Sequence, residues 1–166
     1  MSAALNEINA MGLNSQAVNS LLKGERRKSI VDLQHALHSS RIALRVSESI
    51  PSQQQTRLAC TIRPVALLPG PSQTVADAAF PVFAGAFAFT SIEDESKDEG
   101  MHRHLISAVL LYNMGLCHQQ EAMCRAGCCA VGLETAKAFY RHALDVMELL
   151  SEDIRQDDLL LSLIHI

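Results

Sequence analysis

The sequence predicts an all-α protein made of antiparallel helical hairpins, interrupted by an irregular or short β-like central insertion. Three observations carry this prediction. All five prolines lie between Pro51 and Pro81, and proline is excluded from helix interiors because it lacks an N–H and clashes with the preceding turn. On both sides of that stretch, apolar residues recur every three or four positions, which is the spacing of a buried helical stripe. Ala and Leu are abundant whereas aromatic residues make up only 4% of the chain, a balance that favours helices.

Residues 1–46 are predicted to form the first helical hairpin. Its two helices are separated at Lys23–Glu25, where Gly24 suits a left-handed helix end. Such a short turn makes the helices antiparallel neighbours. In the second helix, one apolar face combines Ile30, Leu33, Ala36 and Leu37. The stripe expected in the first helix consists of Leu5, Ile8, Met11, Leu13, Ala17, Leu21 and Leu22.

Residues 47–100 are predicted to be a linker or insertion with short strands. This segment contains all the prolines and the acidic run Glu93–Glu99, and both resist regular packing. Two parts of it, residues 60–68 and 82–89, are nevertheless apolar. In the second part, Phe83, Phe87 and Phe89 fall on alternate positions, which is typical of a strand. We expect a hairpin or an extended arm that lies against the helices.

Residues 101–150 are predicted to form the second hairpin, with helices over residues 101–125 and 133–150. Gly127 and Gly132 bracket the expected connection. The first of these helices carries an apolar stripe of Leu105, Ala108, Val109, Tyr112 and Leu116. The stripe of the second consists of Ala136, Phe139, Tyr140, Ala143, Leu144 and Met147.

The last residues of the chain predict a truncated repeat followed by a foreign tail. Residues 151–160 are polar and acidic until Leu159 and Leu160, which begin a new apolar run and are expected to open a third repeat. Leu161–Ile166 match the translation of a common sequencing adapter. We therefore expect residues 161–166 not to be native.

Two segments of the chain repeat one pattern of small and large residues. Ser29–Leu37 aligns with Ala136–Leu144, and both segments end in His-Ala-Leu. Small residues at the first and eighth positions of each segment allow neighbouring helices to approach, while Leu33 and Tyr140 fill the space between them. A unit of this kind cannot bury its apolar face alone, so its recurrence indicates a stack of hairpins.

This spacing resembles the second helix of the tetratricopeptide repeat (TPR) family. Ala17 stands twelve positions before Ser29 with Gly24 at the turn, as in an ungapped repeat of that family. In the second unit the corresponding distance grows to twenty-one positions, so its connection is longer. The resemblance covers roughly the first 45 and the last 65 residues. Leu111, Met114 and Gly115 of this chain resemble the Leu-Gly signature of the family's first helix.

The resemblance implies a protein-interaction scaffold or adaptor that binds a peptide or a partner protein in a groove lined by first helices. Polar amides on such a wall can hydrogen-bond a peptide backbone, so the expected contacts are exposed amide side chains. The TPR subtype that clamps a C-terminal carboxylate has Lys and Asn where this chain has Asn14 and Val18, so that clamp is not expected. No catalytic residue or cofactor is assigned, and we do not expect an enzyme. The candidate contacts are Asn14, Asn19, Asn113 and Gln120.

Charge and hydropathy exclude other classes of partner. The net charge is -4, and the single short basic run, Arg26–Lys28, is too small for the basic face that nucleic acid requires. No apolar run reaches the length needed to cross a membrane, and the N-terminus lacks the pattern of a secretory signal. We expect a cytoplasmic protein whose five cysteines stay reduced.

Two alternatives remain open at this point, a Cys/His metal-binding helical domain and a structural oligomerisation module. Zinc prefers Cys and His, and Cys124 and Cys128 would share one helix face, but the chain has no Cys-x-x-Cys pair. A nucleophile is disfavoured because the neighbours Cys117 and His118 would point about 100° apart on a helix. The candidate ligands are His102, His104, Cys117, His118, Cys124, Cys128, Cys129 and His142.

Overall fold

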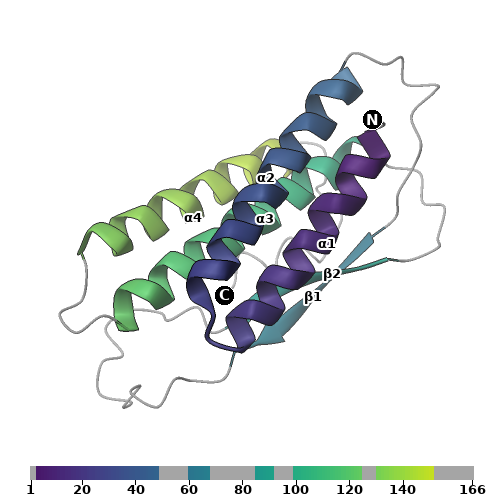
Figure 1. Ribbon diagram of the computed structural model, residues 1–166. Coiled ribbons are helices and arrows are strands. Elements are labelled where there is room, and N and C mark those ends of the chain that lie inside the picture. The colour runs from purple at the N-terminus through teal and green to yellow at the C-terminus, as the bar shows by residue number, and fades with distance from the viewer. Residues whose placement is uncertain (1–2, 49–59, 68–84, 92–98, 125–129, 152–166) are drawn as a thin grey trace.

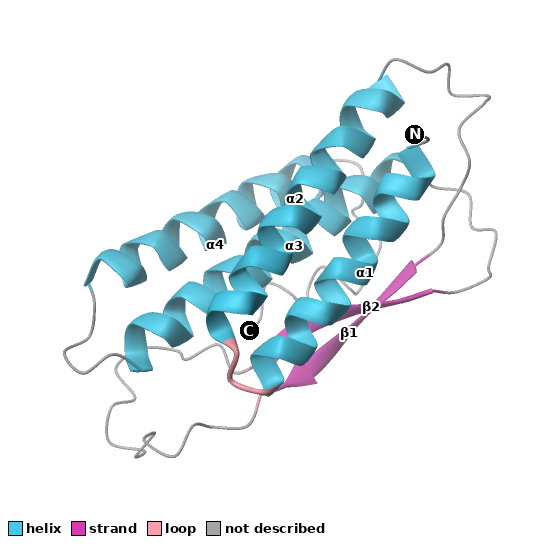
Figure 2. Cartoon of the chain, in the orientation of Figure 1, coloured by secondary structure: helices cyan, strands magenta, loops and turns pink. Residues whose placement is uncertain are grey.

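The computed structural model describes residues 3–48, 60–67, 85–91, 99–124 and 130–151. The helices pack as two antiparallel pairs, α1 with α2 and α3 with α4, and α2 also packs against α3. Figures 1 and 2 show α4 at one side of the array and the two strands at the other side, beyond α1. The elements are α1 (Ala3–Leu22), α2 (Arg26–Glu48), β1 (Cys60–Ala66), β2 (Gly85–Ser91), α3 (Glu99–Cys124) and α4 (Ala130–Ser151). The prediction of a mostly helical fold with a short β-like insertion is confirmed.

The turn between α1 and α2 has the predicted left-handed glycine. Gly24 adopts a φ of 78°, a conformation that a residue without a Cβ enters without strain. Its N–H donates to the carbonyl of Leu21 at 2.9 Å, and the N–H of Glu25 donates to the carbonyl of Ser20 at 2.8 Å. These two bonds satisfy the last carbonyls of α1 and reverse the chain into α2.

Small residues bring the two helices of each hairpin close together, as the repeat predicts. In the first hairpin, the Ser29 hydroxyl donates to the carbonyl of Ala17 at 2.9 Å, and both residues are fully buried. In the second, a Cβ built on Gly115 would lie 3.1 Å from the carbonyl oxygen of Ala136 and 2.8 Å from Cε1 of Tyr140. A larger side chain at either first-helix position would push the helices apart.

The apolar stripe predicted for α1 is wrong in part. Leu5, Ile8 and Leu22 are between 43% and 49% exposed, whereas the polar residues Glu7 and Asn14 are buried. The face of α1 toward α2 is closed by alanines, and its face toward α3 and β2 carries polar groups with polar partners. Periodicity alone cannot separate these two faces from the outer one, because large apolar residues occur on the outer face as well.

Two predictions for α4 also need correction. Leu144 was expected in the buried stripe but is 50% exposed. Gly132 lies inside α4, which begins at Ala130, and not in the connection before it. A Cβ on Gly132 would come within 2.8 Å of the Ala122 Cβ on α3. This glycine therefore serves a close helix contact. Gly127, the acidic residues 93–98 and the expected third repeat and tail over 152–166 lie outside the described residues.

The insertion contains the predicted hairpin. β1 and β2 pair antiparallel, with Pro64 opposite Phe87 and Ile62 opposite Phe89. The strand β2 contacts both α1 and α3, so the sheet lies against the first helices of both units. Both of its faces are buried, since Ala86 and Ala88 are as inaccessible as Phe87 and Phe89. The predicted segment began at Val82, but residues 82–84 lie outside the described part of the chain.

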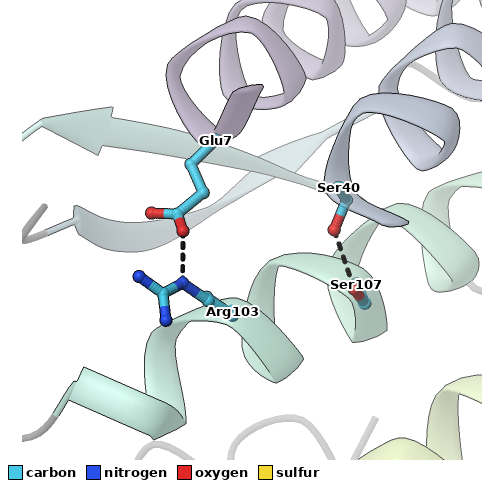
Figure 3. A network of polar contacts seen from close by, with 4 residues as sticks. All are labelled: Glu7, Ser40, Arg103 and Ser107. Carbon is cyan, nitrogen blue, oxygen red and sulfur yellow. Dashed lines mark hydrogen bonds and ion pairs between the residues drawn. The ribbon is translucent and has the colours of Figure 1, made fainter. Parts of the chain in front are cut away.

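Polar contacts fix α3 against both helices of the first hairpin. Arg103 of α3 donates to the carboxylate of Glu7 in α1, and both side chains are buried (Figure 3). On the neighbouring turn, the hydroxyls of Ser40 in α2 and Ser107 in α3 lie 2.8 Å apart. A buried ion pair needs good geometry to balance the loss of hydration, and this one joins α1 to α3.

Candidate functional site

Two buried asparagines, one from each first helix, hold the backbone of β2 at Phe87. Asn113 accepts a hydrogen bond from the Phe87 N–H at 2.9 Å and donates to the Phe87 carbonyl at 2.7 Å. Asn14 donates to the same carbonyl at 3.0 Å. The two amides are also joined to each other, because Asn113 donates to the Asn14 Oδ1 at 2.8 Å. Asn14 is fully buried, and Asn113 is 1% exposed. We call Asn14 and Asn113 the asparagine pair.

Side chains of α1 and α3 take the place that a neighbouring strand would have at this edge of β2. The N–H and the carbonyl of Phe87 both bond to the asparagine pair, so they face away from β1. Two residues earlier on the same edge, the carbonyl of Gly85 accepts from the Tyr112 hydroxyl at 3.2 Å. Pro64 lies opposite Phe87, where its missing N–H would face the outer edge of β1, so no bond of the ladder is lost.

The side chain of Phe87 is held by an aromatic cluster on α3 and α4. Its ring centroid lies 5.0 Å from that of Tyr112 in an edge-on arrangement, and Tyr112 lies 5.4 Å from Tyr140. The Tyr140 hydroxyl donates to Oε1 of Gln119 at 2.7 Å. Burial raises the pKa of Tyr112 to about 12 and raises that of Tyr140 as well, so both phenols stay neutral hydrogen-bond donors. This site therefore offers amides, a hydroxyl and aromatic rings, which suit an extended peptide.

The four predicted contact residues divide into two groups. Asn14 and Asn113 do bind a peptide backbone, but that backbone belongs to this chain, and both are buried where exposure was expected. Asn19 is exposed and Gln120 is partly buried. Tyr112 also contacts β2, a role that the sequence pattern does not predict. For Asn14, the sequence does hold a signal of burial. This residue stands between the small residues Ala10 and Ala17 of α1, and a buried amide there must find a hydrogen-bond partner.

Cys117 and His118, which were candidates for a metal site and for a nucleophile with its base, contact other side chains. Cys117 is buried with its sulfur 3.1 Å from the Ser29 hydroxyl, and burial raises the pKa of its thiol to about 11. The His118 ring stacks on Phe139 at 5.4 Å, and burial lowers its pKa. Among the described residues, no three His, Cys, Asp or Glu side chains come together as metal ligands. Cys128 and Cys129 lie outside that part of the chain. Within the described segments, Cys117 and His118 therefore lie in packing contacts with Ser29 and Phe139.

The basic run at the start of α2 borders a shallow cavity of about 450 Å³. Arg26 lines this cavity, and its buried Nε has no hydrogen-bond partner in the described part of the chain, whereas Arg27 and Lys28 are paired with carboxylates. The side chain of Arg27 lies 3.5 Å from that of Glu121, and that of Lys28 lies 3.5 Å from that of Glu25. An anionic ligand would have to compete with these carboxylates, so the cavity is a weaker candidate than the face that holds β2.

The helices of the described segments include none that is both long enough and apolar enough to span a bilayer. Comparison with protein-family models, with curated proteins and with solved structures finds no significant match. The face around the asparagine pair is therefore interpreted from its own geometry.

Proposed function

We propose that this protein is a non-enzymatic interaction scaffold of the TPR-like class, in which the face formed by α1 and α3 binds extended polypeptide. The observation that carries the proposal is the pairing of the Asn113 side chain with both the N–H and the carbonyl of Phe87. One planar amide thereby mimics a neighbouring strand. Such contacts recognise a backbone in extended conformation whatever its side chains are.

The surroundings of the asparagine pair add a preference for side chains. Tyr112 meets an aromatic ring at the residue that the pair binds. Ala86 and Ala88, on either side of Phe87, are both buried, so this face of the strand is filled by small side chains. The preferred ligand is thus an extended segment with an aromatic residue between two small ones. In the protein alone, β2 fills this role, so a partner segment binds by replacing it.

The state of the titratable groups supports a role in binding over catalysis. A nucleophilic cysteine needs a thiolate at neutral pH, whereas burial keeps the Cys117 thiol protonated. A general base needs a pKa near neutrality and access to its substrate. The His118 ring is instead stacked against Phe139, and its pKa is lowered by burial.

A peptide-exchange experiment tests the proposal. The full chain with Phe87→Ala keeps the asparagine pair but loses the aromatic side chain that anchors its own β2. A fluorescent peptide with the sequence of Gly85–Ser91 should bind this variant at least about tenfold more tightly than it binds the unaltered chain, a difference of about 1.4 kcal/mol. Fluorescence anisotropy measures both affinities, and circular dichroism verifies that the helices of the variant remain folded.

Two matched controls isolate the backbone contact. A peptide N-methylated at the position of Phe87 cannot donate to the Asn113 Oδ1 and should not bind. Adding Asn113→Leu to the Phe87→Ala variant should abolish binding of the unmodified peptide as well. Equal affinity of both peptides for a folded Phe87→Ala chain would show that the α1–α3 face does not recognise backbone.

A further inference from the structure

The ring of Tyr112 lies between β2 and α4. On one side it meets the Phe87 ring edge-on at 5.0 Å, and its hydroxyl donates to the carbonyl of Gly85 at 3.2 Å. On the other side it meets the Tyr140 ring of α4 at 5.4 Å. Tyr112 is only 9% exposed, so its orientation is set by the side chains around it. The contact between Tyr112 and β2 therefore depends on the residue behind Tyr112.

Tyr140 is itself held along one face of α3. A Cβ built on Gly115 would lie 2.8 Å from Cε1 of Tyr140, so the ring packs on the α3 backbone where glycine has no side chain. The Tyr140 hydroxyl donates to Oε1 of Gln119 at 2.7 Å. Gly115 follows Tyr112 by three positions and Gln119 follows Gly115 by four, which places all three on one face of the helix. The α3 backbone and Gln119 thus hold the Tyr140 ring against Tyr112.

The first hairpin has a different combination of residues at the equivalent positions. The close helix contacts make Ala17 equivalent to Gly115, and the repeated segments make Leu33 equivalent to Tyr140. Ala17 and Leu33 both belong to the buried core. In the second hairpin, glycine therefore replaces alanine where tyrosine replaces leucine. Such an exchange keeps the total side-chain volume similar and brings an aromatic ring behind Tyr112.

This aromatic ring occurs in the hairpin that contacts the aromatic side chain of β2. The α1 residue equivalent to Tyr112 is Asn14, which donates to the Phe87 carbonyl. Helix α1 thus contacts the backbone of β2 at this position, whereas Tyr112 also meets the Phe87 ring. Aromatic pairs prefer edge-on or offset arrangements, so this contact is sensitive to the direction of the Tyr112 ring. A backbone contact does not depend on a ring in this way.

We propose that Tyr140 is a positioning residue for the proposed peptide site: it holds the Tyr112 ring toward β2 and so sets the preference for an aromatic residue in the bound segment. The inference rests on the proposed function, in which β2 occupies the place of the ligand. A helical tyrosine has two accessible orientations about its first side-chain torsion. The Tyr140 ring fills the space behind Tyr112 and keeps it in the orientation that meets Phe87. Tyr140 acts through Tyr112, so its loss should leave backbone recognition by the asparagine pair intact.

Binding of two peptides to the full chain tests this inference. The Phe87→Ala chain is titrated by fluorescence anisotropy with the labelled Gly85–Ser91 peptide and with the same peptide carrying leucine in place of Phe87. It should bind the first about fivefold more tightly, because leucine keeps an apolar side chain but loses the ring contact. Adding Gly115→Ala and Tyr140→Leu, the residues of the first hairpin, should reduce this preference to less than about twofold.

Three further variants separate the ring from other effects. Tyr140→Phe keeps the ring and should keep the preference. Phe139→Leu is the matched control, since it removes the neighbouring ring of α4, which stacks on His118, and it should also keep the preference. Tyr140→Leu alone should lower the preference, which provides the test with Gly115 unchanged. Every folded variant, verified by circular dichroism, should still reject the peptide N-methylated at the position of Phe87.

The possible outcomes distinguish this inference from the proposed function. A preference for phenylalanine that persists in both Tyr140→Leu variants, with or without a uniform loss of affinity, would overturn the inference alone. Loss of the preference in Phe139→Leu would do the same, because the effect would then not be specific to Tyr140. Failure of the Phe87→Ala chain to bind either peptide would overturn the proposed function, and the inference with it.

Discussion

Asn113 pairs with the backbone of Phe87 through both ends of its side-chain amide, accepting at 2.9 Å and donating at 2.7 Å. This relationship explains why a buried face of α3 carries an asparagine. A strand edge that lies against helices exposes N–H and carbonyl groups that need partners. An amide supplies both at one residue, and Asn14 completes the contact from the other hairpin.

Replacing the two asparagines should have unequal effects on stability. Asn113→Leu leaves the Phe87 N–H and the Asn14 Oδ1 without a partner, so it should lower the free energy of unfolding by about 2–4 kcal/mol. Asn14→Leu should lower it by about 1–2 kcal/mol, because the Phe87 carbonyl keeps its bond to Asn113. Urea denaturation measures both values. The exposed control Asn19→Leu should stay within about 0.5 kcal/mol of the unaltered chain. Equal losses in the two variants would contradict the hydrogen-bond pattern.

Replacing one partner of the buried ion pair should lower the free energy of unfolding more than replacing both partners. Arg103→Met leaves the Glu7 carboxylate buried without its cation, and Glu7→Leu leaves the Arg103 guanidinium without this carboxylate. Each single change should destabilise the protein by about 3–5 kcal/mol, and the double variant by less than either. A double-mutant cycle from denaturation curves measures the coupling. Additive losses would show that the two side chains are not coupled. The control is Lys137→Ala, which removes one partner of the exposed ion pair between Lys137 and Glu134 and gives the baseline loss of stability.

Two glycines within helices should respond to alanine in opposite directions. Gly12→Ala should raise the free energy of unfolding by about 0.5–1 kcal/mol, because its Cβ meets open space and alanine favours the helix. Gly115→Ala should lower it by about 1–3 kcal/mol, since its Cβ would clash with Tyr140 and the Ala136 carbonyl. Thermal unfolding of the two variants provides the comparison. Stabilisation by Gly115→Ala would mean that the second hairpin is looser than described.

The Cys117 thiol should make stability depend on alkaline pH. Burial raises its pKa from 9.0 to about 11, so the folded protein holds this proton more tightly than the unfolded chain does. The resulting stability is present below pH 9 and is lost as the pH rises from about 9 toward 11. The unaltered chain should therefore lose on the order of 2 kcal/mol more than Cys117→Ala over that range in guanidinium unfolding. Parallel pH profiles for the two proteins would contradict the burial of this thiol.

The sequence predicted the helices and the turn because local signals decide them. Proline confined the insertion, Gly24 marked the reversal into α2, and the small residues at Ser29 and Ala136 indicated close helix contacts. The alternation around Phe87 was sufficient to predict a strand. Each of these signals comes from a few consecutive residues, so no knowledge of the tertiary structure was needed.

The parts that could not be predicted depend on residues far apart in the chain. The helical pattern predicts Asn14 and Asn113 as amides on the first helices, but their burial depends on β2, whose position a helical pattern does not predict. Leu5 and Ile8 looked like core residues because periodicity records spacing and not direction. The pairing of Glu7 with Arg103 has no local signal at all, since the two residues are brought together only when α3 packs on α1.

Hydrogen exchange at a single amide tests the central claim that helical side chains of α1 and α3 hold an extended backbone. The Phe87 N–H, measured by NMR in the full chain, should exchange as slowly as amides of the helical core. In Asn113→Leu its exchange should become at least about tenfold faster, while the amides of α2 exchange as before. A Phe87 amide that exchanges rapidly in the unaltered chain, or one that stays equally protected in Asn113→Leu, would contradict the account.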